Sequence, residues 1–172
     1  MMPHREQAVG KTDEWYTPPR LFNAMGVVFD LDVAHPGLDI VDWIPANQII
    51  THNSLSSKWG GFVWCNPPFG GRNGLDPWLS KFFDHGDGVI LTPDRTSAPW
   101  WQKHAPKADA ILFVSPRVRF IPKEGKTSSP AQGTTLMASG EKGVNALRNA
   151  QQNGLGWMVT VRAAALKETG GE

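Results

Sequence analysis

Short apolar runs recur along the chain and are separated by turns or by segments with helical spacing. These runs are rich in β-branched and aromatic residues, a composition typical of buried strands. They occupy residues 27–34, 62–66, 88–93, 110–115, 134–139 and 156–163. A weaker strand is predicted at 48–51, inside the turn-rich segment 35–58. The pattern therefore predicts a sheet of several short strands.

Helical segments lie between several of these strands. In residues 17–26, Thr17 is expected to cap the helix, a proline follows in the first turn, and Gly26 ends it. Residues 76–86 begin with Asp76 as the expected cap, carry apolar residues on one face and end at a glycine. Shorter helices are predicted at 97–108 and 144–152.

The alternation of strands and helices indicates an α/β fold, a compact sheet with helices on its faces. The 172 residues, of which 40% are apolar, suffice for one domain. Residues 1–13 lack periodicity and are expected to form a flexible arm, and 163–172 a frayed C-terminal tail. The domain is therefore predicted to span residues 14–162, with a mobile loop at 121–135.

Composition and charge exclude several classes of function. The formal charge of +1 and pI near 7.9 provide no general attraction to nucleic acid, so any such contact must come from local basic patches. Cys65 is the single cysteine, and the five histidines lack ligand spacing, so neither a disulfide nor a metal site is expected. No apolar stretch approaches the roughly 20 residues that span a bilayer. A soluble, cytoplasmic protein without membrane contact is predicted.

Polar residues follow three of the predicted strands and point to a site. Asp32, Asn66 and Thr92, the last followed by Pro93, all fall at strand ends. In α/β sheets, ligands bind beyond the carboxyl ends of the strands. Asp at a strand end also commonly caps a turn, so the position alone leaves both interpretations of Asp32 open.

Residues 66–69, Asn-Pro-Pro-Phe, suit recognition of an amino group. The Asn66 side chain and the Pro67 backbone each offer a carbonyl, and the fixed proline angles hold both acceptors in place. Phe69 offers a flat face to a planar ring. If a methyl group moved onto such an amine, the carbonyl dipoles would stabilise the charge that develops on nitrogen. The structural alternative is a turn that merely ends the strand.

Local basic residues suggest where a nucleic acid would bind. They cluster around predicted strand ends and in the glycine-rich loops 70–77 and 121–135, a distribution that favours phosphate contact. These candidates are Arg72, Arg95, Arg117, Arg119, Lys123 and Lys126.

Several motifs, taken in order, make the chain resemble the small, phage-type Dam-like DNA N6-adenine methyltransferases. The family signature N/D/S-P-P-Y/F is matched at 66–69, and the element W-Y-T-P at 15–18. F-x-L-D-x-A is matched from Phe29 to Ala34, L-x-P-x-R-T from Leu91 to Thr96, and R-x-R-F from Arg117 to Phe120. The resemblance covers roughly residues 14–140. The glycine-rich F-x-G-x-G loop of many related enzymes is missing, and His35 and Pro36 take its place.

The resemblance implies a shortened, Rossmann-like S-adenosylmethionine-dependent methyltransferase fold and assigns roles to residues. The catalytic set would be Asn66, Pro67, Pro68 and Phe69. The cofactor-binding set would be Tyr16, Thr17, Pro18, Asp32, Ala34 and Asn53. Phe120 would join the DNA-binding set as a second wall beside the target base.

The leading hypothesis is therefore S-adenosylmethionine-dependent methylation of adenine N6 in double-stranded DNA, with the base flipped into the Asn-Pro-Pro-Phe pocket. A homodimer could enlarge the DNA footprint, and the family's occurrence in phages implies protection of viral DNA against host restriction. Two alternatives stay open. One is a methyltransferase for cytosine N4, RNA or a glutamine amide, and the other is a non-catalytic remnant that binds DNA or cofactor.

Overall fold

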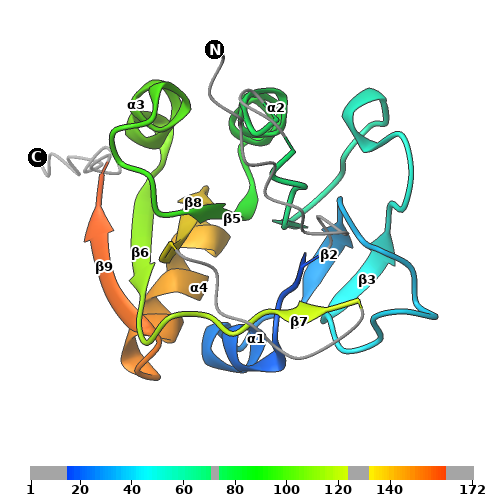
Figure 1. Ribbon diagram of the computed structural model, residues 1–172, viewed down its shortest axis with the longest axis horizontal. Helices are drawn as coiled ribbons and strands as arrows, with labels where there is room; N and C mark the ends of the chain where they lie inside the picture. Colours follow the sequence, from blue (N-terminus) through cyan, green and yellow to red (C-terminus); the bar gives the residue numbers. More distant parts are fainter. Residues whose placement is uncertain (1–14, 71–73, 124–131, 162–172) are drawn as a thin grey trace, which may run out of the picture.

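The computed structural model describes residues 15–70, 74–123 and 132–161 (Figure 1). The predicted arm at 1–13 and tail at 163–172 lie outside these residues, as do Arg72 and Lys126.

A seven-stranded mixed sheet forms the centre of the molecule, in the order β3-β2-β4-β5-β8-β6-β9. The first four strands in this order run parallel. Strand β8 lies antiparallel between β5 and β6, so β5 and β6 run in the same direction, and β9 closes the sheet antiparallel to β6. The strands are β2 (Phe29–Asp32), β3 (Ala46–Ile49), β4 (Val63–Cys65), β5 (Gly88–Pro93), β6 (Ala110–Val114), β8 (Thr134–Ser139) and β9 (Gly156–Thr160).

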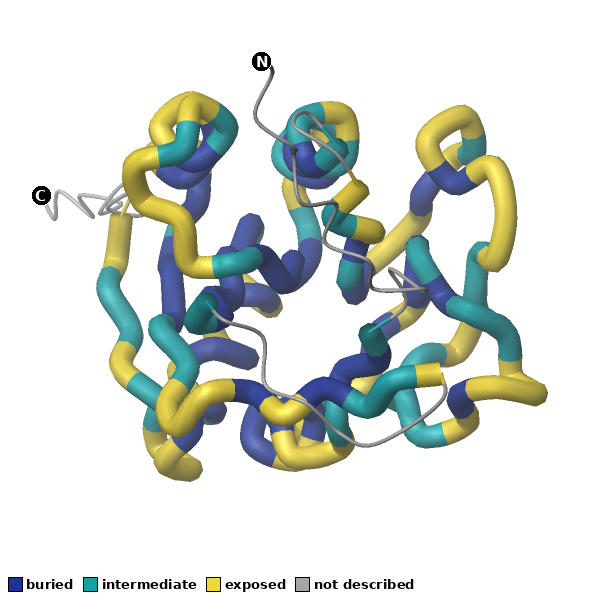
Figure 2. Tube along the Cα trace, in the orientation of Figure 1, coloured by how far each residue is buried: buried dark blue, intermediate teal, exposed yellow. Residues whose placement is uncertain are grey.

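Helices cover both faces of this sheet, as Figure 1 shows. Helices α1 (Pro19–Met25) and α4 (Glu141–Gln152) pack together on one face. On the other face lie α2 (Asp76–His85) and α3 (Pro99–His104). Each face buries its own apolar cluster, and strands β5 and β8 are buried almost throughout (Figure 2). The predicted α/β fold is confirmed.

The first helix ends where the sequence predicts, but its start differs. Gly26 adopts a left-handed conformation with φ of 62°, and its N–H donates to the Phe22 carbonyl. The cap position is Pro18, and Thr17 makes no capping hydrogen bond. The prediction of a Thr17 cap is therefore wrong, because the Thr17 hydroxyl accepts from Asn66 instead.

The predicted cap of α2 also differs. Leu75 occupies the cap position and Asp76 is the first helical residue. The Asp76 carboxylate accepts hydrogen bonds from Lys103 Nζ at 3.0 Å and pairs with His104 Nε2 at 2.9 Å. Both partners lie on α3, so Asp76 joins the two helices that cover this face, and these hydrogen bonds hold its pKa below the usual range.

The weak strand lies slightly earlier than predicted, at β3 rather than at 48–51. The segment after β6 forms only a short strand, β7 (Ile121–Pro122), which pairs antiparallel with β1 (Trp15–Tyr16). This small sheet brings the 117–123 segment beside the start of the described chain. No helix in the described part of the chain is long and apolar enough to cross a membrane.

Candidate active site

A pocket of about 450 Å³ lies beyond the carboxyl ends of β3, β2 and β4. The chain passes from β2 to β3 on one side and then returns to β4 on the other, so the strand order reverses at β2. Such a reversal opens a crevice where α/β proteins bind their ligands. The lining residues are Trp15, Tyr16, Thr17, Asp32, Val33, Ala34, His35, Pro36, Ile44, Ile50, Thr51, His52, Asn53, Ser54, Trp64, Asn66, Pro67, Pro68, Phe69 and Trp78.

The Asn66 amide is oriented by two hydrogen bonds across the pocket. Its Nδ2 donates to the Trp15 carbonyl at 3.0 Å and to the Thr17 hydroxyl at 3.1 Å. A backbone carbonyl can only accept, so the amide nitrogen must face Trp15. No described residue donates to Asn66 Oδ1. The amide oxygen is therefore the atom that remains available to an incoming donor.

Thr17 connects this amide to the protein interior. Its side chain is 1% exposed, and its carbonyl accepts from Trp43 Nε1 at 2.9 Å. The Thr17 hydroxyl and the Thr17 carbonyl thus each accept a hydrogen bond, the first from Asn66 and the second from Trp43. This arrangement makes Thr17 part of the support for Asn66 rather than part of the helix end.

Replacement of Thr17 with valine should lower kcat for the methyl transfer that the motif resemblance implies by about tenfold, because valine keeps the shape but removes one of the two acceptors that orient the Asn66 amide. Cofactor affinity, measured by calorimetry, should change much less than kcat, which is measured under saturating substrates. Thr17→Ser, which keeps the hydroxyl, is the matched control. Equal losses of kcat in both variants would contradict this role for the hydroxyl.

Asp32 lies at the end of β2, between β3 and β4, and lines the pocket. It is 1% exposed, and its Oδ1 accepts from the Ala34 N–H at 3.0 Å. Burial raises the pKa of its carboxyl from 3.8 to about 7, and the Ala34 hydrogen bond offsets only part of this shift. The backbone around it is fixed, since the Asp32 carbonyl accepts from the Ile50 N–H at 2.8 Å. A buried carboxyl with one hydrogen-bond donor is suited to a cationic or hydroxylic ligand.

One residue that lines the pocket carries a second buried polar atom. Trp64 Nε1 is buried and has no hydrogen-bond partner within the described residues. Buried donors of this kind normally have a partner. The Trp64 ring packs in the core against Phe22 and Phe29, so this N–H is a donor of the protein interior without a partner among the described residues.

Asn53 follows β3 and lines the far side of the pocket. It adopts a left-handed conformation with φ of 54°, which is uncommon outside glycine. Its carbonyl accepts from the Ser57 hydroxyl at 2.8 Å, so the turn that it begins is held together locally. Of the other predicted cofactor residues, Tyr16, Thr17, Asp32 and Ala34 also line the pocket, and Pro18 does not.

Phe120 does not lie where the resemblance implied. It is 2% exposed and belongs to the apolar cluster under α1 and α4, together with Val118. Its role as a second wall beside the target base stays a prediction, and in this structure the ring packs in the core. Phe69, by contrast, is partly buried and lines the pocket.

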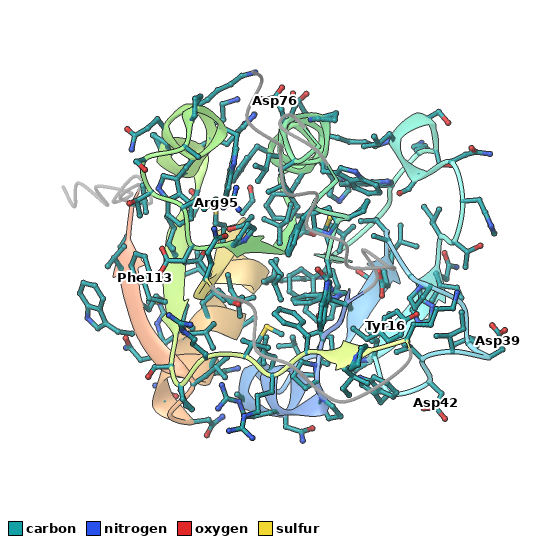
Figure 3. The ribbon with its side chains drawn as sticks, viewed as in Figure 1. Tyr16, Asp39, Asp42, Asp76, Arg95 and Phe113 are labelled. Atoms are coloured by element: carbon teal, nitrogen blue, oxygen red, sulfur yellow. The ribbon has the colours of Figure 1, made fainter. Side chains whose placement is uncertain are left out.

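The basic candidates that the structure describes are exposed: Arg95, Arg117, Arg119 and Lys123. Arg95 follows β5 and Arg117 follows β6, and these strands run in the same direction. Their loops therefore emerge at the edge of the sheet that carries Asn66. Arg95 Nε donates to Gln132 Oε1 at 2.6 Å, and Figure 3 shows Arg95 beside β5 and β8, with Tyr16 near β7.

Sequence reasoning missed several pocket residues. Trp64 precedes Cys65 in an apolar strand and gave no polar signal, whereas Trp78 lies within a helix. His35 and His52 follow strands β2 and β3. Their positions at strand ends could have identified them as pocket residues. Thr92 also ends a strand, but its buried hydroxyl pairs with Thr135 at 2.7 Å, outside the pocket.

The sheet and pocket together define the class of protein. A mixed sheet with a parallel centre, four flanking helices and a pocket at the reversal of strand order is consistent with the Rossmann-like fold of methyltransferases. The family model of DNA N-6-adenine-methyltransferase (Dam) matches residues 5–149, and the chain belongs to this family. The resemblance drawn from the motifs is thus confirmed, and family membership implies methylation of adenine N6 in DNA. No curated protein and no solved structure matches the chain significantly.

Proposed function

We propose that the chain transfers a methyl group from S-adenosylmethionine to the N6 amino group of an adenine that has been flipped out of duplex DNA into the Asn-Pro-Pro-Phe pocket. The observation that carries this proposal is the Asn66 amide, whose nitrogen is engaged by Trp15 and Thr17 and whose oxygen remains available. It lies at the reversal of strand order, one strand away from Asp32.

The residues present fit S-adenosylmethionine. A pocket of about 450 Å³ is in the range of small-molecule sites. The buried Asp32 carboxyl suits an ammonium group or ribose hydroxyls. Tyr16 and Thr17 would lie at the methionine end, and Asp32, Ala34 and Asn53 would contact the remainder, whereas Pro18 lies outside the pocket lining. When bound, this cofactor supplies an electrophilic methyl group on a sulfonium.

Asn66 and Pro67 would position the amine for attack. Asn66 Oδ1 and the Pro67 carbonyl accept its two N–H groups, which aligns the nitrogen lone pair with the methyl group. As the C–N bond would form and the methyl–sulfur bond would break, with S-adenosylhomocysteine as the leaving group, positive charge would move onto the nitrogen, where the Asn66 and Pro67 carbonyl dipoles would stabilise it. The proton then passes to water. Pro68 fixes the turn, and Phe69 offers its ring to the base.

The exposed basic residues at the same edge support binding of DNA. An adenine inside the stacked duplex cannot reach Asn66, so the base must be flipped out. Arg95, Arg117 and Arg119 would hold the phosphate backbone during this step, together with Lys123 and the two predicted contacts Arg72 and Lys126. Residues 14–162 would form the methyltransferase domain. A homodimer and a role in protecting phage DNA from restriction stay predictions.

The proposal is tested by incubating the protein with labelled S-adenosylmethionine and unmethylated double-stranded DNA, then digesting the DNA and identifying the nucleosides by mass spectrometry. Label in N6-methyladenine is the expected result. Label in N4-methylcytosine would show that cytosine is the substrate. Transfer only to RNA or to a glutamine-containing peptide would assign one of these substrates in place of adenine in DNA. Cofactor binding below detection by calorimetry, combined with retained DNA binding, would favour the non-catalytic alternative.

A further inference from the structure

One lysine makes an unusual set of contacts behind the Asn53 side of the pocket. Lys81, on α2, donates from Nζ to the carbonyls of Ser54 and Leu55 at 2.9 Å each, and also to the Ser57 carbonyl. These acceptors belong to the turn around η1 (Ser54–Ser56), which directly follows Asn53. A single ammonium group with three donors therefore satisfies three backbone carbonyls of one turn. Hydrogen bonds of this kind are stronger than those between neutral groups.

The same lysine contacts an aromatic pair. Lys81 Nζ lies 4.8 Å from the centre of the Trp59 ring, within the range of a cation–π interaction. Trp59 Nε1 donates to Ser54, both to its carbonyl at 3.1 Å and to its hydroxyl at 3.0 Å. The Trp59 ring is stacked with Trp78, with centroids 6.3 Å apart and planes at 29°. Trp59 is buried, whereas Trp78 is partly exposed and lines the pocket.

This wall lies at the opposite side of the pocket from the amine-binding turn. Asn53 follows β3 and Asn66 follows β4, and both strands are neighbours of β2. Since adjacent strands are about 4.8 Å apart, two inter-strand spacings place these strand ends about 10 Å apart. Asp32 lies between them at the end of β2. The pocket thus has an amine side at Asn66 and an aromatic side at Trp78.

We propose that Lys81 is a positioning residue that fixes the η1 turn and the Trp59–Trp78 pair as the wall against which the adenine half of the cofactor stacks. The proposal rests on the function proposed above, because the methyl group must lie at the Asn66 side. The planar heterocycle then extends past Asp32 toward Trp78. An aromatic ring held from behind by a fixed neighbour loses little freedom on binding a flat ligand.

Loss of the Lys81 ammonium group should make the η1 turn and the Trp59–Trp78 pair more mobile and leave the geometry around Asn66 unchanged. Three carbonyls would lose their shared donor, and the turn that begins at Asn53 would lose its tie to α2. A more mobile Trp78 would stack less well on a purine. Base–aromatic stacking is strong enough for its loss to reduce affinity about tenfold.

The experiment compares Lys81→Met, which keeps the aliphatic stem, with Lys81→Arg, which keeps the charge. Affinity for S-adenosylhomocysteine and for 5′-methylthioadenosine is measured by calorimetry at a temperature where each variant is folded. Lys81→Met is expected to weaken both ligands about tenfold, with DNA affinity unchanged, and Lys81→Arg should recover most of the loss. Lys142→Met, an exposed site on α4 across the sheet, is the matched control.

Other outcomes would contradict the role of Lys81, the stacking wall or the proposed function. Unchanged ligand affinity in folded Lys81→Met, or an equal loss of DNA affinity, would overturn the role of Lys81. If Lys81→Met does not fold, Trp78→Ala carries the test, and unchanged affinity for 5′-methylthioadenosine would overturn the stacking wall. Failure of the wild-type protein to bind S-adenosylhomocysteine would instead overturn the proposed function itself.

Discussion

Replacement of Asn66 with alanine should lower kcat for methyl transfer by about 10² to 10³-fold, the range found when one transition-state hydrogen-bonding group is removed. The reason is that Asn66 Oδ1 would accept from the target amine only as charge develops on nitrogen. The ground-state contacts of Asn66 are with Trp15 and Thr17, not with the Asp32 region. Cofactor affinity should therefore stay within about threefold of wild type.

Asn66→Asp is the informative partner of this variant. A carboxylate keeps an acceptor toward the amine and can accept from the Thr17 hydroxyl, but it loses the N–H that faces the Trp15 carbonyl. Its kcat should fall between those of wild type and Asn66→Ala. Rates would be measured at saturating cofactor and DNA, with cofactor affinity from calorimetry. An Asn66→Ala enzyme that retains more than about a tenth of wild-type kcat would show that the amide is not the catalytic acceptor.

Local rules of sequence predicted most of the fold, because the strands are short apolar runs between strong turn signals. The buried strands β4, β5 and β8 and the end of α1 at Gly26 are examples. The errors concern side chains whose tertiary partner competes with a local one. Thr17 was expected to cap a helix and instead accepts from Asn66, and Asp76 was expected to cap α2 and instead joins α3.

The candidate site could be predicted in part for the same reason. Asp32 and Asn66 stand out because polar residues follow apolar strands, and the structure brings both to one pocket. Trp78 and Lys81 could not be found in this way, since their positions depend on how α2 packs against the η1 turn. Phe120 was assigned from a motif alone, and the apolar cluster that holds it depends on the packing of the whole sheet.

Asp32→Asn should stabilise the protein at high pH and weaken cofactor binding at the same time. The carboxyl has a pKa of 3.8 when exposed and about 7 in the folded chain, because burial disfavours its charged form. Its favourable contribution to folding is therefore complete below pH 3.8 and is lost as the pH rises through about 7. The shift corresponds to a destabilisation on the order of 4 kcal/mol once the carboxyl is ionised in both states.

Asparagine has the shape of the neutral acid and can still accept from the Ala34 N–H, but it never ionises. Urea unfolding should give nearly equal free energies for Asp32→Asn and wild type near pH 4. The variant should be more stable by about 4 kcal/mol at pH 8. Asp30→Asn, which removes an exposed carboxylate from the same strand and can still accept from the Phe62 N–H, is the matched control for the loss of one carboxylate. Equal pH dependence in wild type and Asp32→Asn would contradict the shifted pKa.

The same variant separates stability from function. If Asp32 contacts a cationic or hydroxylic part of the cofactor, the more stable Asp32→Asn protein should bind S-adenosylhomocysteine at least about tenfold more weakly at pH 8. If Asp32 only supported the fold, its replacement by asparagine would raise stability without lowering cofactor affinity, because a more stable pocket should bind the cofactor at least as well. A gain of stability with unchanged affinity would show that Asp32 does not contact the cofactor. Its role would then be that of a buried turn residue whose carboxylate accepts a hydrogen bond from the Ala34 N–H. A gain in stability together with a loss of cofactor affinity would show that the buried carboxylate destabilises the fold and serves to bind the ligand.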